Sequence, residues 1–224
     1  MRQSPSSASS SQKWSEPIIV LGKGVPAYSA TYGCLVYCVA GIGENACWLR
    51  LFPLFAEKVI SSIQFVEKFD VIRVVYREKR PEQIRPESRK VYPEYVEKIS
   101  SVNEEAKRVE ILSQHTEVGT FLHDDSWRGK KTLGMIQAVG PLFLVDHGTP
   151  KVRFRCSDVC TGHVCEVGEL KRFDGVGRSI PEGTETLEHK LAIYRNKALR
   201  FVMGTDSQHP HRWLLISMHI METS

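Results

Sequence analysis

Short apolar segments separated by turn residues make up the first half of the chain. β-Branched and aromatic side chains dominate these segments, and glycine or proline follows several of them, a pattern typical of strands joined by turns. Helical spacing of apolar residues predicts a helix at 56–65, and a cap at Asn103 predicts a second helix at 104–115. Prolines make 79–93 an extended loop. We expect strands at 17–21, 34–42, 46–55, 69–76 and 96–102.

The second half of the chain, from Thr132 onward, has the same character. Its first two apolar segments flank Gly140 and Pro141, so a hairpin is expected there. A later segment places leucines at four-residue spacing, which predicts a helix with one apolar face. We expect strands at 132–139, 142–146, 151–155, 199–203 and 213–221 and a helix at 184–197.

The order of these segments predicts a mainly β fold with a few helices, of the β-barrel or α+β type. Strands are short and closely spaced, and no long alternation of strand and helix indicates a doubly wound sheet. We expect a disordered Ser-rich tail at 1–15, an N-terminal barrel-like domain at 16–118 and a C-terminal β-rich domain at 130–224.

Composition is that of an ordinary folded protein. Of the 224 residues, 42% are hydrophobic and 25% are charged, and no apolar run approaches the ~20 residues of a membrane span. The first residues do not resemble a secretory leader, so we expect a cytoplasmic protein without membrane contact. In that reducing compartment, clustered cysteine and histidine favour a metal over disulfides.

The densest group of such residues is a Cys-x3-Cys-x2-His-x-Cys loop formed by Cys156, Cys160, His163 and Cys165. Thiolate and imidazole are zinc ligands, and a closed site of four protein ligands is structural because it leaves no position for a reactive water. The spacing is not a standard finger spacing, and His163 and Cys165 need a bent backbone to reach one ion. The alternative is a run of reduced cysteines between two strands.

Basic residues with aromatic neighbours gather between Arg73 and Lys90, in a chain of net charge +4. Such a mixture can follow a phosphate backbone and stack bases, although the glutamates interspersed here also fit an ordinary solvated loop. Arg85 and Arg89 are the candidate phosphate contacts, and Glu87 between them could hold one guanidinium in place. An ordinary surface ion pair is the alternative.

Trp48 and Arg50 lie two residues apart in an expected strand, so their side chains share a face. On an exposed face they could stack a base and hold a phosphate. On a buried face Trp48 would be core, with Arg50 extending outward.

Two other histidine groups are weaker candidates. His123 precedes Asp124 and Asp125, a trio that could bind a hard divalent ion, although adjacent side chains diverge. His209 and His211 could complete the metal site in place of Cys165. The sequence contains no phosphate-binding loop, serine-hydrolase elbow or zinc-protease motif.

The motifs WLRLFP, FDVIRV, RPES, Cys-x3-Cys-x-Gly-His, LRFVMGT and WLLI, in this order over residues 17–221, resemble an uncharacterised bacterial family of tandem OB-like barrels. That family occurs among mobile-element and defence genes. The resemblance implies two small OB-like barrels and nucleic-acid recognition, with Trp48, Arg50, Arg85 and Glu87 inside matching blocks. The stretch GKGVPAYS departs from the family pattern, which puts contacts of the first loop in doubt.

Together these features predict a non-catalytic protein that binds a nucleic-acid single strand or oligonucleotide and carries a structural zinc. A metal-dependent nuclease or phosphodiesterase is the first alternative. The second is an adaptor whose zinc loop stiffens a docking surface for a protein partner that the sequence does not identify.

Overall fold

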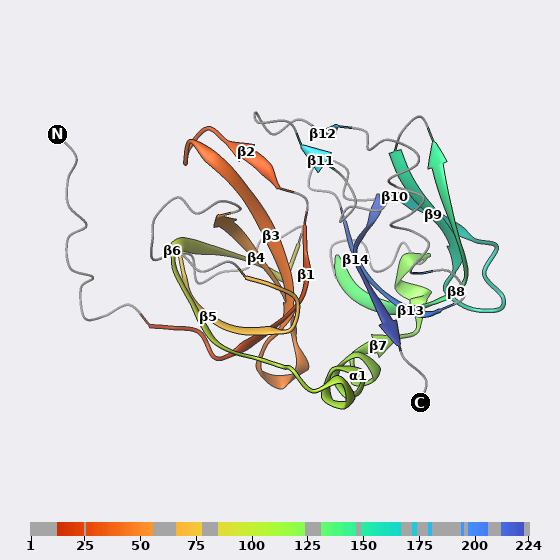
Figure 1. Ribbon diagram of the computed structural model, residues 1–224, viewed down its shortest axis with the longest axis horizontal. Helices are drawn as coiled ribbons and strands as arrows, with labels where there is room; N and C mark the ends of the chain where they lie inside the picture. The colour runs from red at the N-terminus through yellow and green to blue at the C-terminus, as the bar shows by residue number, and fades with distance from the viewer. Residues whose placement is uncertain are drawn as a thin grey trace.

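The computed structural model describes residues 13–24, 26–55, 66–77, 85–123, 131–146, 149–166, 172–173, 179–180, 194, 197–205 and 212–221. Within them the fold is mainly β, as expected, with two large sheets and one α-helix. Figure 1 shows the two sheets as barrels side by side, with the helix beneath the place where they meet. None of the helices in these residues has the length and apolar character of a membrane span.

The first sheet closes into a five-stranded barrel. Its strands are β1 (Ile18–Lys23), β3 (Cys34–Ile42), β4 (Trp48–Phe55), β5 (Asp70–Tyr76) and β6 (Ser88–Ser101). Each strand pairs with the next around the ring β1–β3–β4–β6–β5–β1, and only β4 and β6 run parallel. This is the closed Greek-key order of an OB barrel. The short strand β2 (Ala27–Ser29) extends the β3 edge.

The second sheet follows the same order. Its main strands are β8 (Leu133–Asp146), β9 (Thr149–Arg155), β10 (His163–Glu166), β13 (Ala198–Thr205) and β14 (Trp213–Met221). β8 pairs with β9 and β13, β9 with β10, and β13 with β14. β10 contacts β14 where the ring would close. β7 (Thr116–Glu117) adds to β8, and β11 (Arg172–Phe173) pairs with β12 (Ser179–Ile180) apart from the barrel.

The prediction of a hairpin around Gly140 and Pro141 is wrong. Both segments belong to the single strand β8, whose register shifts between Val139 and Leu142. Gly140 has φ +57°, so this irregularity bends the strand without ending it. One half of β8 can then pair with β13 and the other with β9. The loop expected at 79–93 is also shorter, because β6 begins at Ser88.

The connection between the barrels contains the helix that the sequence predicts. α1 spans Glu105–Gln114, and the 3-10 turn η2 (Gly119–Leu122) follows β7. Ile111 and Leu112 form the buried face of α1 and pack where the two barrels meet. The helices expected at 56–65 and 184–197 lie outside the described residues, apart from two isolated positions in the second.

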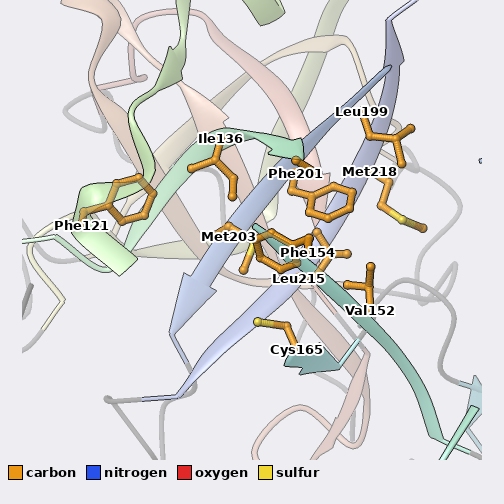
Figure 2. Close-up of a cluster of buried hydrophobic side chains, with 11 residues drawn as sticks. Phe121, Ile136, Val152, Phe154, Cys165, Leu199, Phe201, Met203, Leu215 and Met218 are labelled. Carbon is orange, nitrogen blue, oxygen red and sulfur yellow. The ribbon is translucent and has the colours of Figure 1, made fainter. Parts of the chain in front are cut away.

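The described residues form three clusters of buried apolar side chains. One lies inside the first barrel, around Val39, Leu51 and Ile72. Another fills the second barrel, where Figure 2 shows Phe154 and Phe201 among the buried side chains. A third joins residues from both barrels and from α1, which makes the two barrels one packed unit. Its buried members are Leu21, Ala40, Ile42, Phe69, Val102, Ile111, Leu112, Leu133, Met135, Val202 and Met221.

His219 of β14 also links the barrels. Its Nε2 lies 2.6 Å from the carbonyl oxygen of Leu21 in β1, so the neutral ring donates this hydrogen bond. Burial, together with nearby Lys68, lowers the pKa of His219 to about 4. At neutral pH the ring is therefore uncharged and the bond between the barrels is present.

The free energy of unfolding should fall as the pH drops from about 6.5 to about 4. In this range His219 is protonated in the unfolded chain but stays neutral in the folded protein. The loss from this one group is at most about 3 kcal/mol. Urea unfolding at several pH values would measure it. His219→Gln keeps a donor for Leu21 but cannot titrate, so its pH profile should be flatter than that of the parent protein. Identical profiles would contradict the assignment.

Candidate metal centre and nucleic-acid face

Four potential metal ligands converge beside the second barrel. His123 follows η2, Cys156 follows β9, Cys160 lies in the turn between β9 and β10, and His163 begins β10. One ligand atom from each lies within 4.8 Å of all the others. Three chain segments, including the connection between the barrels, therefore meet at one point.

The spacing of these atoms suits a tetrahedral ion. Nε2 of His123 lies 3.1 Å from Nε2 of His163 and 3.1 Å from Sγ of Cys156. Two nitrogens bound to tetrahedral zinc lie about 3.3 Å apart, and a nitrogen and a sulfur about 3.6 Å apart. Two thiolates and two imidazoles are also the donor set that zinc prefers. The cluster could hold a metal such as zinc.

The pKa shifts of two of these ligands, His163 and Cys160, favour the forms that bind a metal. Burial and the neighbouring His123 lower the pKa of His163 to about 4, so its ring is neutral. Burial alone would raise the pKa of Cys160, but backbone N–H groups of Cys156 and Gly162 outweigh it and lower the pKa. Burial and the Cys160 thiol raise the pKa of Cys156. A bound cation would favour the thiolate form of both cysteines.

Two glycines allow the segments to approach one another. Gly162 has φ +123°, a conformation that other residues rarely adopt, and its N–H donates to Sγ of Cys160 over 3.3 Å. Gly119 in η2 packs directly on Cys156, and a Cβ there would overlap the cysteine side chain. Glycine at 119 is thus what lets the connection between the barrels reach the metal loop.

Cys165, the fourth ligand expected from the sequence, is not part of this group, and His123 stands in its place. Cys165 points into the apolar core of the second barrel, as Figure 2 shows, and burial raises its pKa to about 11. The physical reason is the extended backbone of β10, in which side chains two residues apart are separated by about 6.6 Å. His163 and Cys165 share a face but cannot easily share an ion.

The other histidine candidates have different outcomes. His123 belongs to the cluster of four, whereas its sequence neighbours Asp124 and Asp125 lie outside the described residues, as do His209 and His211. His123 lies 33 positions before Cys156, and no local motif connects the two. The fold alone brings them together.

Arg50 is buried rather than exposed, which corrects its expected role as a phosphate contact. It is 5% exposed, and its guanidinium donates to the carbonyl oxygens of Thr205 at 3.0 Å and Thr132 at 2.6 Å. Both acceptors belong to the second barrel. Trp48 is half-buried against the shared core, and its Nε1 donates to Glu117 at 3.1 Å. A nucleic acid could not reach Arg50 in this arrangement.

Glu87 also joins the barrels. Its two carboxylate oxygens accept from the backbone N–H and the hydroxyl of Thr132, at 2.8 and 2.7 Å. Arg89 is partly buried, and its Nη1 donates to the carbonyl oxygens of Pro86 and Ser88. Arg85 is likewise partly buried. Glu87 thus fixes the segment around the start of β6, where both arginines lie, against the second barrel.

The outer face of the first barrel carries an aromatic residue that the sequence reasoning missed. Phe52 of β4 is 42% exposed, whereas Leu51 and Leu54 of the same strand are buried. Exposed Lys90 is its partner in the β4–β6 register, and the backbone N–H of exposed Arg77 donates to the Lys90 carbonyl oxygen. Lys90 therefore lies on the strand next to Phe52, and Arg77 lies one strand further, on the other side of β6.

Residues 15–114 match the sequence model of a family described as a domain of unknown function, DUF8758. The match covers the first barrel and α1. No curated protein matches the chain.

Solved structures with a similar arrangement include HIN domains. The p204 HINb domain has a TM-score of 0.38 and 13% identity, over 92% of this chain and 96% of that chain. The tetrameric p202 HIN2 has a TM-score of 0.36 and 10% identity, over 94% and 97%. A murine DNA-binding protein bound with double-stranded DNA has a TM-score of 0.37 and 8% identity, over 93% and 99%. These likenesses are distant, and the barrel assignment rests on strand pairing.

Proposed function

We propose that this protein binds single-stranded nucleic acid without cleaving it, on the outer face of the first barrel at β4 and β6. The observation that carries the proposal is the exposed ring of Phe52, with Lys90 on the next strand and Arg77 beyond Lys90. A base can stack on such a ring whatever its sequence, while neighbouring cations attract the phosphates. Arg85, in the loop between β5 and β6, and Arg89, near the start of β6, add positive charge to the same barrel.

We assign two domains and one structural metal site to the chain. We assign the N-terminal domain to 16–118 and the C-terminal domain to 130–224, packed as one unit through their shared core. We assign a structural zinc to His123, Cys156, Cys160 and His163, because four protein ligands leave no position for a reactive water. The ion would fix the connection between the barrels to the β9–β10 hairpin.

Replacing Phe52 by Ala should weaken binding of a labelled oligo-dT by about five- to 150-fold. The reason is that stacking one base on an aromatic side chain contributes about 1–3 kcal/mol. Fluorescence anisotropy at constant salt measures the change. Ile99→Ala is the matched control, because Ile99 of β6 is another exposed apolar residue, 45% exposed. Equal affinities of the two variants would rule out the Phe52 face.

Replacing Arg85 and Arg89 together by Ala should flatten the dependence of log affinity on log salt by about 1.4. Each phosphate contact with a single strand releases about 0.7 counterion, and two contacts are removed. The control double variant is Lys23→Ala with Arg73→Ala, which removes the same charge from residues paired with Glu67 and Glu97. A slope equal to that of the control would place these two arginines away from the ligand.

A further inference from the structure

The outer face of β9 is a row of cations. Val152 and Phe154 are buried in the second barrel, so the alternating residues Lys151, Arg153 and Arg155 lie on the opposite face of the strand. Both arginines are exposed. Same-face residues repeat at about 6.6 Å along a strand, a spacing that a stretched phosphodiester backbone can follow.

Apolar side chains stand on both sides of Arg153. Its register partners are Leu142 on β8 and Val164 on β10, which are 53% and 56% exposed. The solvent side of an antiparallel sheet is normally polar, so two exposed apolar residues flanking one guanidinium are unusual. Aliphatic side chains at such a position can contact sugars and bases, while the guanidinium pairs with a phosphate or stacks on a base.

The position of this row in the fold is informative. β9 and β10 occupy the second and third places of their barrel, as β3 and β4 do in the first. The row therefore lies on the face that corresponds to the Phe52 face. Nη1 of Arg155 donates to the carbonyl oxygen of Asp158 over 3.3 Å, which connects the row to the loop that holds the candidate metal ligands.

Among the described side chains of β9, Arg153 and Arg155 are the exposed cations. Glu166 is the register partner of Lys151. Asp158 is exposed in the metal loop near the Arg155 end of the row. Arg153, in the middle, has apolar residues as both of its partners.

We propose that the outer β8–β9–β10 face of the second barrel is a second contact surface for single-stranded nucleic acid. Arg153 and Arg155 bind phosphates, and Leu142 and Val164 contact the sugars and bases between them. This surface is separate in the sequence and in the fold from Phe52 and the Arg85–Arg89 segment, so it extends the binding surface beyond the first barrel.

The test is the binding of an oligo-dT of about 12 nucleotides, within the range of about 4–16 that one OB barrel spans. Arg153→Gln with Arg155→Gln should weaken binding and reduce the salt slope by about 1.4, through the loss of two phosphate contacts. Lys107→Gln with Lys197→Gln is the control, because it removes the same charge from exposed positions on α1 and before β13.

Zinc content and unfolding midpoint show whether the double variant keeps its fold. If the change at Arg155 disturbs the metal loop, the single variant Arg153→Gln tests the proposal. Its slope of log affinity against log salt should change by about 0.7. Affinity and slope equal to those of the lysine control would overturn the proposal. Repeating the arginine changes in the Phe52→Ala protein separates the two surfaces. A further loss there supports this one even if Phe52→Ala alone has no effect.

Discussion

Protein purified without chelator should contain about one zinc per chain, and His123→Ala should lose it while Cys165→Ala keeps it. His123 lies within 4.8 Å of the other three candidate ligands, whereas Cys165 packs in the core. Removal of the ion should destabilise the second barrel on the order of 5 kcal/mol. This is less than the ~10–16 kcal/mol seen in zinc-finger peptides, because the barrel also has an apolar core.

Elemental analysis of the two variants and of the parent protein checks the ligand set. Thermal unfolding with and without chelator measures the stabilisation by the ion. Cys165→Ala should cost only a small loss of packing, since it shortens one buried side chain. Zinc retained in His123→Ala and lost in Cys165→Ala would reverse the assignment. Less than half an equivalent of zinc in the parent protein would contradict the presence of a metal site.

Replacement of Arg50 by Met should lower the free energy of unfolding by about 4 kcal/mol. The guanidinium is buried and makes hydrogen bonds to two carbonyl oxygens of the second barrel, and a charged donor contributes about 1.5–3 kcal/mol to each such bond. Methionine fills a similar volume but donates nothing. Because the lost bonds join the two barrels, unfolding should also become less cooperative.

Urea unfolding followed by two probes would measure both effects. Arg73→Met in β5 is the control, since Arg73 forms a largely exposed ion pair with Glu97 that contributes at most about 1 kcal/mol. Arg50→Lys should recover only part of the loss, because an ammonium group cannot present the planar fork of a guanidinium. A loss in Arg50→Met no larger than in Arg73→Met would contradict the role of Arg50 as a link between barrels.

Local sequence patterns predicted those elements whose conformation is set by neighbouring residues in the chain. The cap signal at Asn103 located α1, although the residue at its N-cap is Glu104, and alternation at 151–155 predicted β9. They failed at β8, where Gly140 and Pro141 resemble a turn. The strand continues there because its two halves pair with different neighbours, a long-range effect that the local sequence does not record.

For the candidate site, too, local spacing identified some residues and long-range packing determined the rest. The Cys-x3-Cys-x2-His spacing located three candidate metal ligands, but the fourth, His123, comes from a distant segment that approaches only because Gly119 packs on Cys156. The pattern of β4 placed Trp48 and Arg50 on one face. Whether that face meets solvent or another barrel depends on the packing of the two halves, which brings Thr132 and Thr205 onto Arg50.

The most direct test of the account is the binding of a labelled oligo-dT to the parent protein in a salt titration. We expect saturable binding that weakens steeply as salt rises, because cations of both barrels neutralise phosphates. We also expect the oligonucleotide to stay intact when magnesium, manganese or zinc is added. Absence of binding at low salt would contradict the central claim and leave the adaptor interpretation, and cleavage that depends on the metal would contradict it in favour of a nuclease.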